Sequence, residues 1–327
     1  MPSWLLNCPP TLKNGIKWGK SMKKLSLIVS VYNEEQGLNE FYKVTSGILD
    51  ALSGYETEIC FINDGSTDKS GELLDAIKSA DPDRVKVITF SRNFGHEAAM
   101  CAGLDYADGD FLIFMDADLQ HPPQKIPEIM EAFENGAEVI SMVRTKNPDA
   151  GLIKKVTSAL FYGLINRLST AKMEPGASDF FAIAKKPAEV LRANYREKIR
   201  FLRGYVQNIG FNKVNLTYEA AKRVAGESHY SIGRLWKLCV NTIVCFSDVP
   251  LKAGIAAGLL SGLAGLILII YTLITRNGAP SGYATIVIAL CFMFAVLFLL
   301  LGIIGEYIAV IYTENKDRPI YIVKEVK

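Results

Sequence analysis

The stretch Phe111-Leu-Ile-Phe-Met-Asp-Ala-Asp-Leu-Gln-His-Pro-Pro123 decides the fold. Its apolar run predicts a buried strand, and the prolines that follow stop the strand and open a helix. Asp116 and Asp118 come at the strand's end, on one side of an extended backbone, because side chains alternate with period two. Mg²⁺ takes one or two carboxylates and fills its octahedron with water and phosphate oxygens. The pair is a candidate metal site, although such a pattern taken alone more often marks a solvated turn.

Polar clusters also follow the other predicted strands. These strands cover residues 25–31, 58–63, 85–90 and 139–143. Strand and helix alternate four times, which predicts an open, mostly parallel α/β sheet with helices on both faces. The polar clusters should then meet at the carboxyl edge of the sheet, where such folds bind nucleotides. Neither a dinucleotide-binding glycine motif nor a P-loop is present in the sequence, which disfavours dehydrogenases and P-loop enzymes.

Two apolar stretches near the C-terminus predict a hairpin of two transmembrane helices, at about 253–275 and 283–312. Each reaches the roughly 20 residues that cross a bilayer, and neither contains Lys or Arg. Two buried core helices are the alternative. Basic residues lie before the first span and after the second, so the positive-inside rule predicts a multi-pass protein of the plasma or inner membrane with its large domain in the cytoplasm.

The chain is expected to divide into five segments. These are an extension that we expect to be disordered (1–21), a cytoplasmic α/β domain (22–229), an amphipathic interfacial helix (230–250), the transmembrane hairpin (251–313) and a cytoplasmic tail (314–327). A core helix is the alternative for 230–250. Small residues in the first span allow close helix packing, and we expect a homo-oligomer, with a tetramer as one option.

Composition narrows the class of partner. The chain has 36 Lys plus Arg against 34 Asp plus Glu, so its total charge predicts no nucleic-acid partner. Its six cysteines form no Cys-x-x-Cys pair and lie mostly in apolar runs, which predicts reduced thiols in a protein that faces the cytosol. The first 21 residues lack the apolar core of a secretory signal.

The chain resembles the family 2 glycosyltransferases, and among them the membrane-anchored polyprenyl-phosphate hexosyltransferases, which include the bactoprenol glucosyltransferases and dolichyl-phosphate mannose synthases. The resemblance runs from about Lys23 to the tail. Its motifs are Val31–Glu35, Asn63–Ser66, Asp116–Pro123, Ser178–Phe180 and Arg223–Ser228, followed by the two apolar spans. The family has a GT-A-type nucleotide-binding fold, which agrees with the sheet predicted above.

The resemblance implies a role for each motif. It assigns the base and ribose of a nucleotide-sugar donor to Tyr32, Asn33, Glu35 and Asp64. It assigns Mg²⁺ or Mn²⁺, together with the donor diphosphate, to Asp116, Asp118 and Gln120. It assigns the acceptor phosphate to Arg223 and Ser228, and on charge we add Arg144 and Arg200. By the same analogy Asp179 is a catalytic base, although it could instead position the acceptor or the sugar.

The expected reaction is an inverting transfer of a hexose to polyprenyl phosphate, with undecaprenyl phosphate as the acceptor in a bacterial cell envelope. UDP-glucose or UDP-N-acetylglucosamine is the expected donor, and GDP-mannose is the alternative. A membrane protein that binds nucleotide sugars without turnover is the rival from another class. A polysaccharide synthase is disfavoured, because no Gln-x-x-Arg-Trp motif follows Asp179.

Overall fold

The structure is a computed structural model, which describes residues 22–146, 174, 176–198, 200–219, 249–274 and 282–327. The expectations for the extension 1–21, for most of the interfacial helix and for Arg223 and Ser228 lie outside the described residues.

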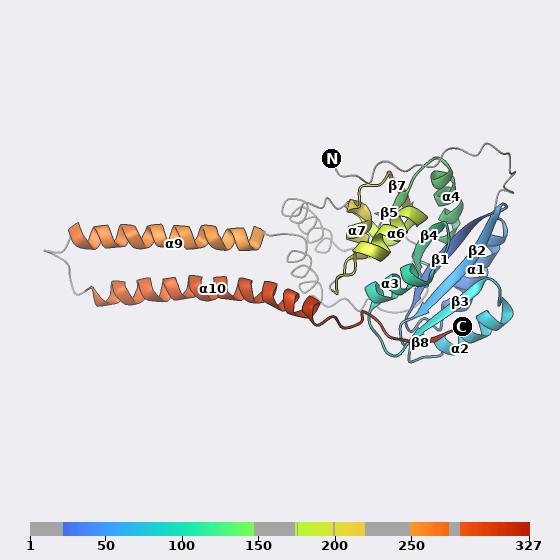
Figure 1. Ribbon diagram of the computed structural model, residues 1–327, viewed down its shortest axis with the longest axis horizontal. Helices are drawn as coiled ribbons and strands as arrows, with labels where there is room; N and C mark the ends of the chain where they lie inside the picture. The colour runs from blue at the N-terminus through green and yellow to red at the C-terminus, as the bar shows by residue number, and fades with distance from the viewer. Residues whose placement is uncertain (1–21, 147–173, 175, 199, 220–248, 275–281) are drawn as a thin grey trace, which may run out of the picture.

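An eight-stranded sheet forms the centre of the α/β body, in the order β7-β5-β6-β4-β1-β2-β3-β8 (Figure 1). The strands are β1 (Lys23–Val31), β2 (Tyr55–Asn63), β3 (Val85–Phe90), β4 (Phe111–Asp116), β5 (Val139–Lys146), β6 (Ala177–Ala184), β7 (Lys213–Glu219) and β8 (Val323–Val326). β4, β1, β2 and β3 run parallel to one another, as do β5 and β7. β6 lies antiparallel between β4 and β5, and β8 lies antiparallel against β3. The predicted mostly parallel sheet is confirmed.

Helices cover both faces of this sheet and enclose two hydrophobic cores. One core packs under α1 (Leu38–Asp50), α2 (Ser70–Ala80) and α4 (Ile126–Glu134), and the other under α3 (His96–Tyr106), α6 (Lys185–Asn194) and α7 (Leu202–Asn208). The sequence of β1 is a continuous apolar run because both faces of the strand are buried. Leu27 and Val29 belong to the first core while Ile28 belongs to the second, as a parallel strand buried on both faces requires.

Truncating a side chain of the first core should destabilise this body. Phe41 on α1 is fully buried and packs edge-on against Phe61, with ring centroids 6.5 Å apart. Phe41→Ala should therefore lower the free energy of unfolding by about 3–5 kcal/mol. Lys43→Ala, at an exposed position of the same helix, is the control. Thermal unfolding of the purified full chain measures both, and equal melting temperatures for the two variants would show that this core is misplaced.

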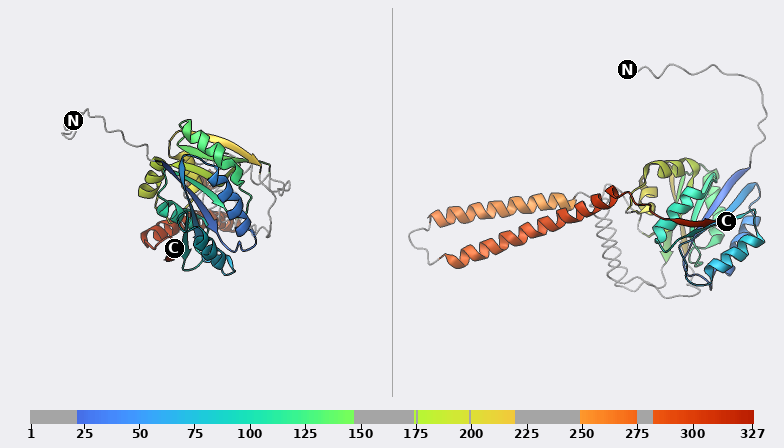
Figure 2. Two further views of the ribbon diagram at one scale, coloured as in Figure 1. Left: turned by 90° about the vertical axis from the view of Figure 1, so that its right-hand side faces the viewer. Right: turned by 60° about the horizontal axis from the view of Figure 1, so that its bottom comes forward.

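The C-terminal tail contributes a strand to the sheet. β8 adds to the edge of β3, and the Tyr321 ring stacks on Phe90 at 5.1 Å. The Tyr321 hydroxyl donates to Asp105 Oδ2 at 2.7 Å, and Lys327 Nζ lies 2.8 Å from Asp75 Oδ1. The segment after the last helix thus runs back onto the body, as the right view in Figure 2 shows. The end of that helix is therefore held beside the α/β body.

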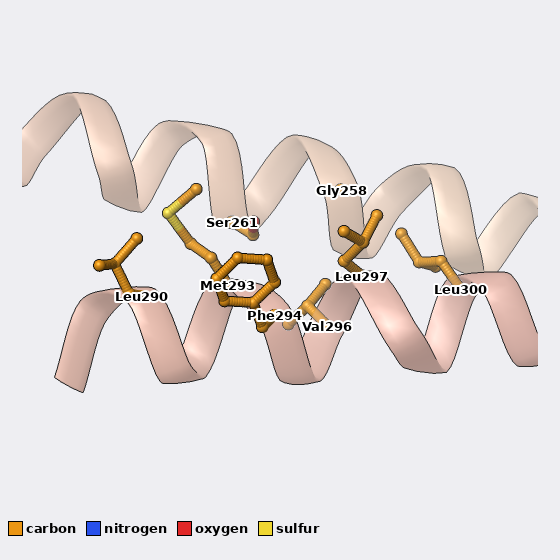
Figure 3. A pocket seen from close by; sticks show the side chains of 8 residues that line it. All are labelled: Gly258, Ser261, Leu290, Met293, Phe294, Val296, Leu297 and Leu300. Atoms are coloured by element: carbon orange, nitrogen blue, oxygen red, sulfur yellow. The ribbon is translucent and has the colours of Figure 1, made fainter. Parts of the chain in front are cut away.

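Two long helices, α9 (Val249–Ile274) and α10 (Tyr283–Asn315), lie side by side and project away from the body (Figure 1). Their ends lie within a few residues of the predicted spans. Leu290, Leu297 and Leu300 of α10 point toward α9 and line a groove of about 290 Å³ between the helices (Figure 3). Within the described residues, one segment, Phe292–Asn315, is long and apolar enough to cross a membrane, and none of it is buried.

Candidate functional site

Asp116 lies at the carboxyl end of β4, beside the end of β1. Its Oδ1 accepts a hydrogen bond from Ser30 Oγ at 2.9 Å, and its Oδ2 lies 3.6 Å from His121 Nδ1. The Asp116 backbone N–H donates to the same Nδ1 at 3.1 Å, so that nitrogen carries no proton. Burial lowers the pKa of His121, whose ring stacks on Phe180. A neutral, fixed imidazole therefore orients Asp116, whose side chain stays 32% exposed at the sheet edge.

A tight turn follows Asp116 and carries Asp118. Asp118 Oδ1 accepts the backbone N–H of Gln120 at 3.0 Å, while Ala117 between the two aspartates is buried. Leu119 has a φ of +58°, which is rare for a bulky residue and marks local strain of the kind found at functional sites. The two partly exposed carboxylates therefore lie on a constrained turn at the open edge of the sheet.

The donor set fits a hard divalent ion. Among the described residues, no group of three or more His, Cys, Asp or Glu side chains is arranged as a metal cage. Mg²⁺ needs no such cage, since it is commonly held by one or two carboxylates plus substrate phosphates, and Asp116 and Asp118 would supply those carboxylates. The contact that the structure gives Gln120 comes from its backbone, and its predicted role as a third ligand stays a prediction.

His96, the first residue of α3, connects Asp116 to Asp179. Its Nδ1 lies 3.0 Å from Ser30 Oγ and 3.5 Å from Asp116 Oδ1, and its Nε2 lies 3.7 Å from Asp179 Oδ2. Burial opposes protonation of His96, but the carboxylates of Asp116, Asp179 and Glu97 outweigh it and raise its pKa. Sequence reasoning gave His96 no role. The available signal was its place in the polar segment after the third strand, at the same edge as the aspartates.

Asp179, on β6, is held between this histidine and a cation. Arg203 of α7 places Nη1 3.3 Å from Asp179 Oδ1, and the Asp179 side chain is 28% exposed. β6 pairs with β4, so the antiparallel strand brings Asp179 to the edge that carries Asp116. Two motifs more than 60 residues apart thus form one cluster with His96.

The predicted nucleotide-binding residues lie on two loops that brace each other. Asn33 Oδ1 accepts the backbone N–H of Thr67 at 2.9 Å, and Glu35 Oε2 accepts that of Lys69 at 3.1 Å. Tyr32 is 46% exposed at the same edge and open to a ligand. These contacts fix the β1 and β2 loops relative to each other and leave the binding roles as predictions.

Asp64 is buried and holds the start of α3. Its Oδ1 and Oδ2 accept the backbone N–H groups of Phe94, at 2.6 Å, and Gly95, at 2.9 Å. Burial raises the pKa of Asp64 although these two hydrogen bonds oppose the rise. Gly65 next to it has a φ of +66°, and a Cβ there would lie 2.4 Å from the Arg92 carbonyl carbon. Only glycine lets this loop approach the residues before His96.

The structure assigns Arg144 and Arg200 to different surroundings. Arg144 Nε donates to the Tyr218 hydroxyl at 3.3 Å, and the Tyr218 ring packs edge-on against His121, on the Asp116 side. Arg200 Nη1 instead donates to Cys101 Sγ of α3 at 2.8 Å. The predicted grouping of these arginines around one acceptor phosphate therefore has no common contact in the described residues.

Glu97 should make stability depend on pH. Its Oε2 accepts the Leu202 N–H at 2.9 Å, and burial, with a contribution from Asp179, raises its pKa from 4.5 to about 7. The proton is held more tightly in the folded state. Its stabilising contribution is therefore complete below pH 4.5 and is lost as pH rises through about 7.

Glu97→Gln, which stays neutral at every pH, should therefore lose less stability than the wild type between pH 5 and pH 8. Melting temperatures of the two proteins at both pH values measure this difference. Glu72→Gln, at an exposed position of α2, is the control and should follow the wild type. Parallel pH dependence in the Glu97 variant and the wild type would contradict the buried placement of this carboxyl.

Comparison with known proteins shows which families and proteins this chain is similar to. The model described as Glycosyl transferase family 2 matches residues 26–191, and that described as the GtrB C-terminal hairpin matches residues 249–311. A bactoprenol glucosyl transferase of Shigella phage SfV is 37% identical over 308 residues, 93% of this chain and 99% of that protein. The uncharacterized glycosyltransferase YkcC of Bacillus subtilis is 37% identical over 303 residues, 92% of this chain and 93% of that protein.

A solved structure is also similar at lower identity. It is glucosyl-3-phosphoglycerate synthase from Mycobacterium tuberculosis, in complex with Mn²⁺, UDP and phosphoglyceric acid. The TM-score is 0.45 and the identity is 17%, over 68% of this chain and 76% of that one.

Proposed function

Because this chain belongs to glycosyl transferase family 2, we propose that it transfers glucose from UDP-glucose to a polyprenyl phosphate, with undecaprenyl phosphate as the bacterial acceptor. The observation that carries the proposal is the cluster of Asp116, His96 and Asp179 at the carboxyl edge of the sheet. Relatives named bactoprenol glucosyl transferase support the acceptor class, since their similarity extends over more than nine-tenths of the chain.

The proposal places the reaction at the cytoplasmic face of the membrane. The hairpin match and the exposed apolar surface of α10 support attachment to a membrane. The basic residues that flank the two spans favour a cytoplasmic body, and β8 holds the end of α10 to that body. Both flanks of the proposed two-span hairpin would then lie on one side of the bilayer.

The donor is proposed to bind at the carboxyl ends of β1, β2 and β4. Tyr32, Asn33, Glu35 and Asp64 would surround the base and ribose. Asp116, Asp118 and Gln120 would hold Mg²⁺ or Mn²⁺ against the diphosphate. When bound, such an ion neutralises the charge that develops on the leaving diphosphate. Ser30 holds the Asp116 carboxylate in place for that contact, and His121 holds the Asp116 backbone.

In the proposed reaction, an oxygen of the lipid phosphate forms a bond to the anomeric carbon of glucose. The bond from that carbon to the UDP oxygen breaks, and the configuration inverts. A phosphate monoester has a second pKa near 6, so it is mostly a dianion at neutral pH and needs little general-base help. Asp179, paired with Arg203, is therefore proposed to position the reactants. Arg144, Arg200, Arg223 and Ser228 remain the proposed acceptor-phosphate residues.

Incubation of membranes that contain the protein with radiolabelled donor and undecaprenyl phosphate tests this function. UDP-glucose should give a lipid-soluble labelled product, and membranes without the protein should give none. UDP-N-acetylglucosamine and GDP-mannose are run in parallel, and a product from either alone would reassign the sugar. Binding of donor without a product from any of the three would favour the non-catalytic rival.

A further inference from the structure

A basic pocket of about 410 Å³ lies where the segment after α10 meets the body. Four cations line it: Lys198, Arg200, Lys316 and Arg318. Glu97 supplies the carboxylate of this lining. Cations from segments more than 100 residues apart converge on one space, which favours an anionic ligand of small size.

The Arg200 guanidinium has one buried nitrogen without a protein partner. Its Nε donates to the Glu197 carbonyl at 2.7 Å and its Nη1 to Cys101 Sγ at 2.8 Å. Its Nη2 is buried and has no hydrogen-bond partner among the described residues. A buried donor left without an acceptor costs free energy, and a guanidinium is well matched to phosphate oxygens. A phosphate oxygen would satisfy Nη2.

The pocket lies at the edge of the apolar part of α10. Lys316 follows that helix directly, and its Nζ lies 4.3 Å from the ring centroid of Tyr312. Lys198 joins the two walls, because its backbone N–H donates to Glu314 Oε1 at 2.7 Å and its Nζ lies 2.8 Å from Asp317 Oδ1. Figure 2 shows the end of α10 meeting the body here. Basic side chains next to a membrane helix are at the depth of lipid phosphates.

We propose that this pocket binds the phosphate group of an anionic membrane lipid. The ligand chemistry is shared by polyprenyl phosphate and by anionic phospholipids. The first turn of α3 separates the pocket from the candidate active site, since His96 contacts Asp116 and Asp179 while Glu97, the next residue, lines the pocket. Burial raises the pKa of Glu97 to about 7, so its repulsion of a phosphate is reduced at neutral pH.

Charge reversal of the two cations that follow α10 tests the proposal. Purified full-length wild type, the double variant Lys316→Glu/Arg318→Glu and the control Lys324→Glu, at an exposed position of β8, are placed in phosphatidylcholine nanodiscs. Native mass spectrometry then measures retention of a short-chain polyprenyl phosphate and, separately, of phosphatidylglycerol. The wild type and Lys324→Glu should retain at least one of these lipids. The double variant should bind it at least about tenfold more weakly, since each charge-assisted contact contributes on the order of 1.5 kcal/mol or more.

The lipid arms identify the source of the phosphate. Selective loss of polyprenyl phosphate makes the pocket a site that holds this lipid beside the active site, and selective loss of phosphatidylglycerol makes it a phospholipid site; both support the proposal. Equal retention by the double variant and the wild type, at equal melting temperatures, overturns it. Inorganic phosphate that displaces the lipid at an equal concentration also overturns it, because lipid attachment would then contribute nothing.

The same preparations separate this inference from the proposed function. If the protein retains lipid through this pocket but transfers no sugar, the lipid-binding inference is supported and the proposed glucosyl transfer is contradicted. Sugar transfer with lipid retention unchanged in the double variant does the reverse.

Discussion

Asp118→Ala is expected to lower the rate of lipid-linked sugar formation by about 10³-fold, while the protein still inserts into membranes. Removing one group that stabilises the charge of a leaving group typically costs 10²–10³ in rate, and loss of a metal ligand belongs at the upper end. Asp118 is a partly exposed carboxylate on the turn after β4, and its Oδ1 accepts the backbone N–H of Gln120. Its side chain belongs to neither hydrophobic core, so folding should survive the change.

The radiolabelled-sugar assay measures this loss, and Asp83→Ala, in the exposed loop before β3, is the matched control. A second readout is UDP-dependent binding of Mn²⁺, followed by electron paramagnetic resonance. The wild type and the control should bind the ion, and the Asp118 variant should not. Turnover near the wild-type rate in the Asp118 variant would remove this residue from the metal site.

The sequence predicted the centre of the sheet because each of its strands is apolar on both faces. The run 111–115 is typical of this, and Asp116 marks its end at the carboxyl edge of the sheet. β6 could not be predicted to lie antiparallel between β4 and β5, since nothing local to Asp179 shows which strands it joins. β8 has four residues, three of them exposed, and such a pattern resembles a loop.

The candidate site was predictable at its aspartates and less so at the residues that connect them. Asp116 and Asp179 belong to recognisable motifs, whereas His96 acquires its position only when α3 starts at the same sheet edge. Arg144 and Arg200 were grouped on charge alone. Folding places Arg144 beside Tyr218 and Arg200 beside α3, and charge in a sequence carries no information about which element a side chain will face.

Asp179→Asn is expected to lower kcat by about 10²-fold. Loss of one group that is positioned to stabilise a transition state typically lowers kcat by about 10²–10³-fold, and the lower end of that range is expected here. Asparagine keeps the shape of the side chain but carries no charge, so it cannot form the ion pair with the Arg203 guanidinium, whose Nη1 lies 3.3 Å from Asp179 Oδ1. His96, 3.7 Å away on the other side, would lose one of the three carboxylates that raise its pKa. In the variant, His96 and Arg203 should therefore be held less firmly, while the fold is retained.

The pH profile decides between positioning and general-base catalysis. If Asp179 were the base, the variant should recover activity as pH rises, because more of the acceptor phosphate would already be deprotonated. If Asp179 positions the reactants, the variant should be less active than the wild type by the same factor at every pH, so that the two pH profiles have the same shape. Arg203→Gln removes the partner and leaves the carboxylate, so it should reproduce most of the loss. We expect the parallel profile, since a phosphate that is mostly dianionic at neutral pH leaves a base little to remove.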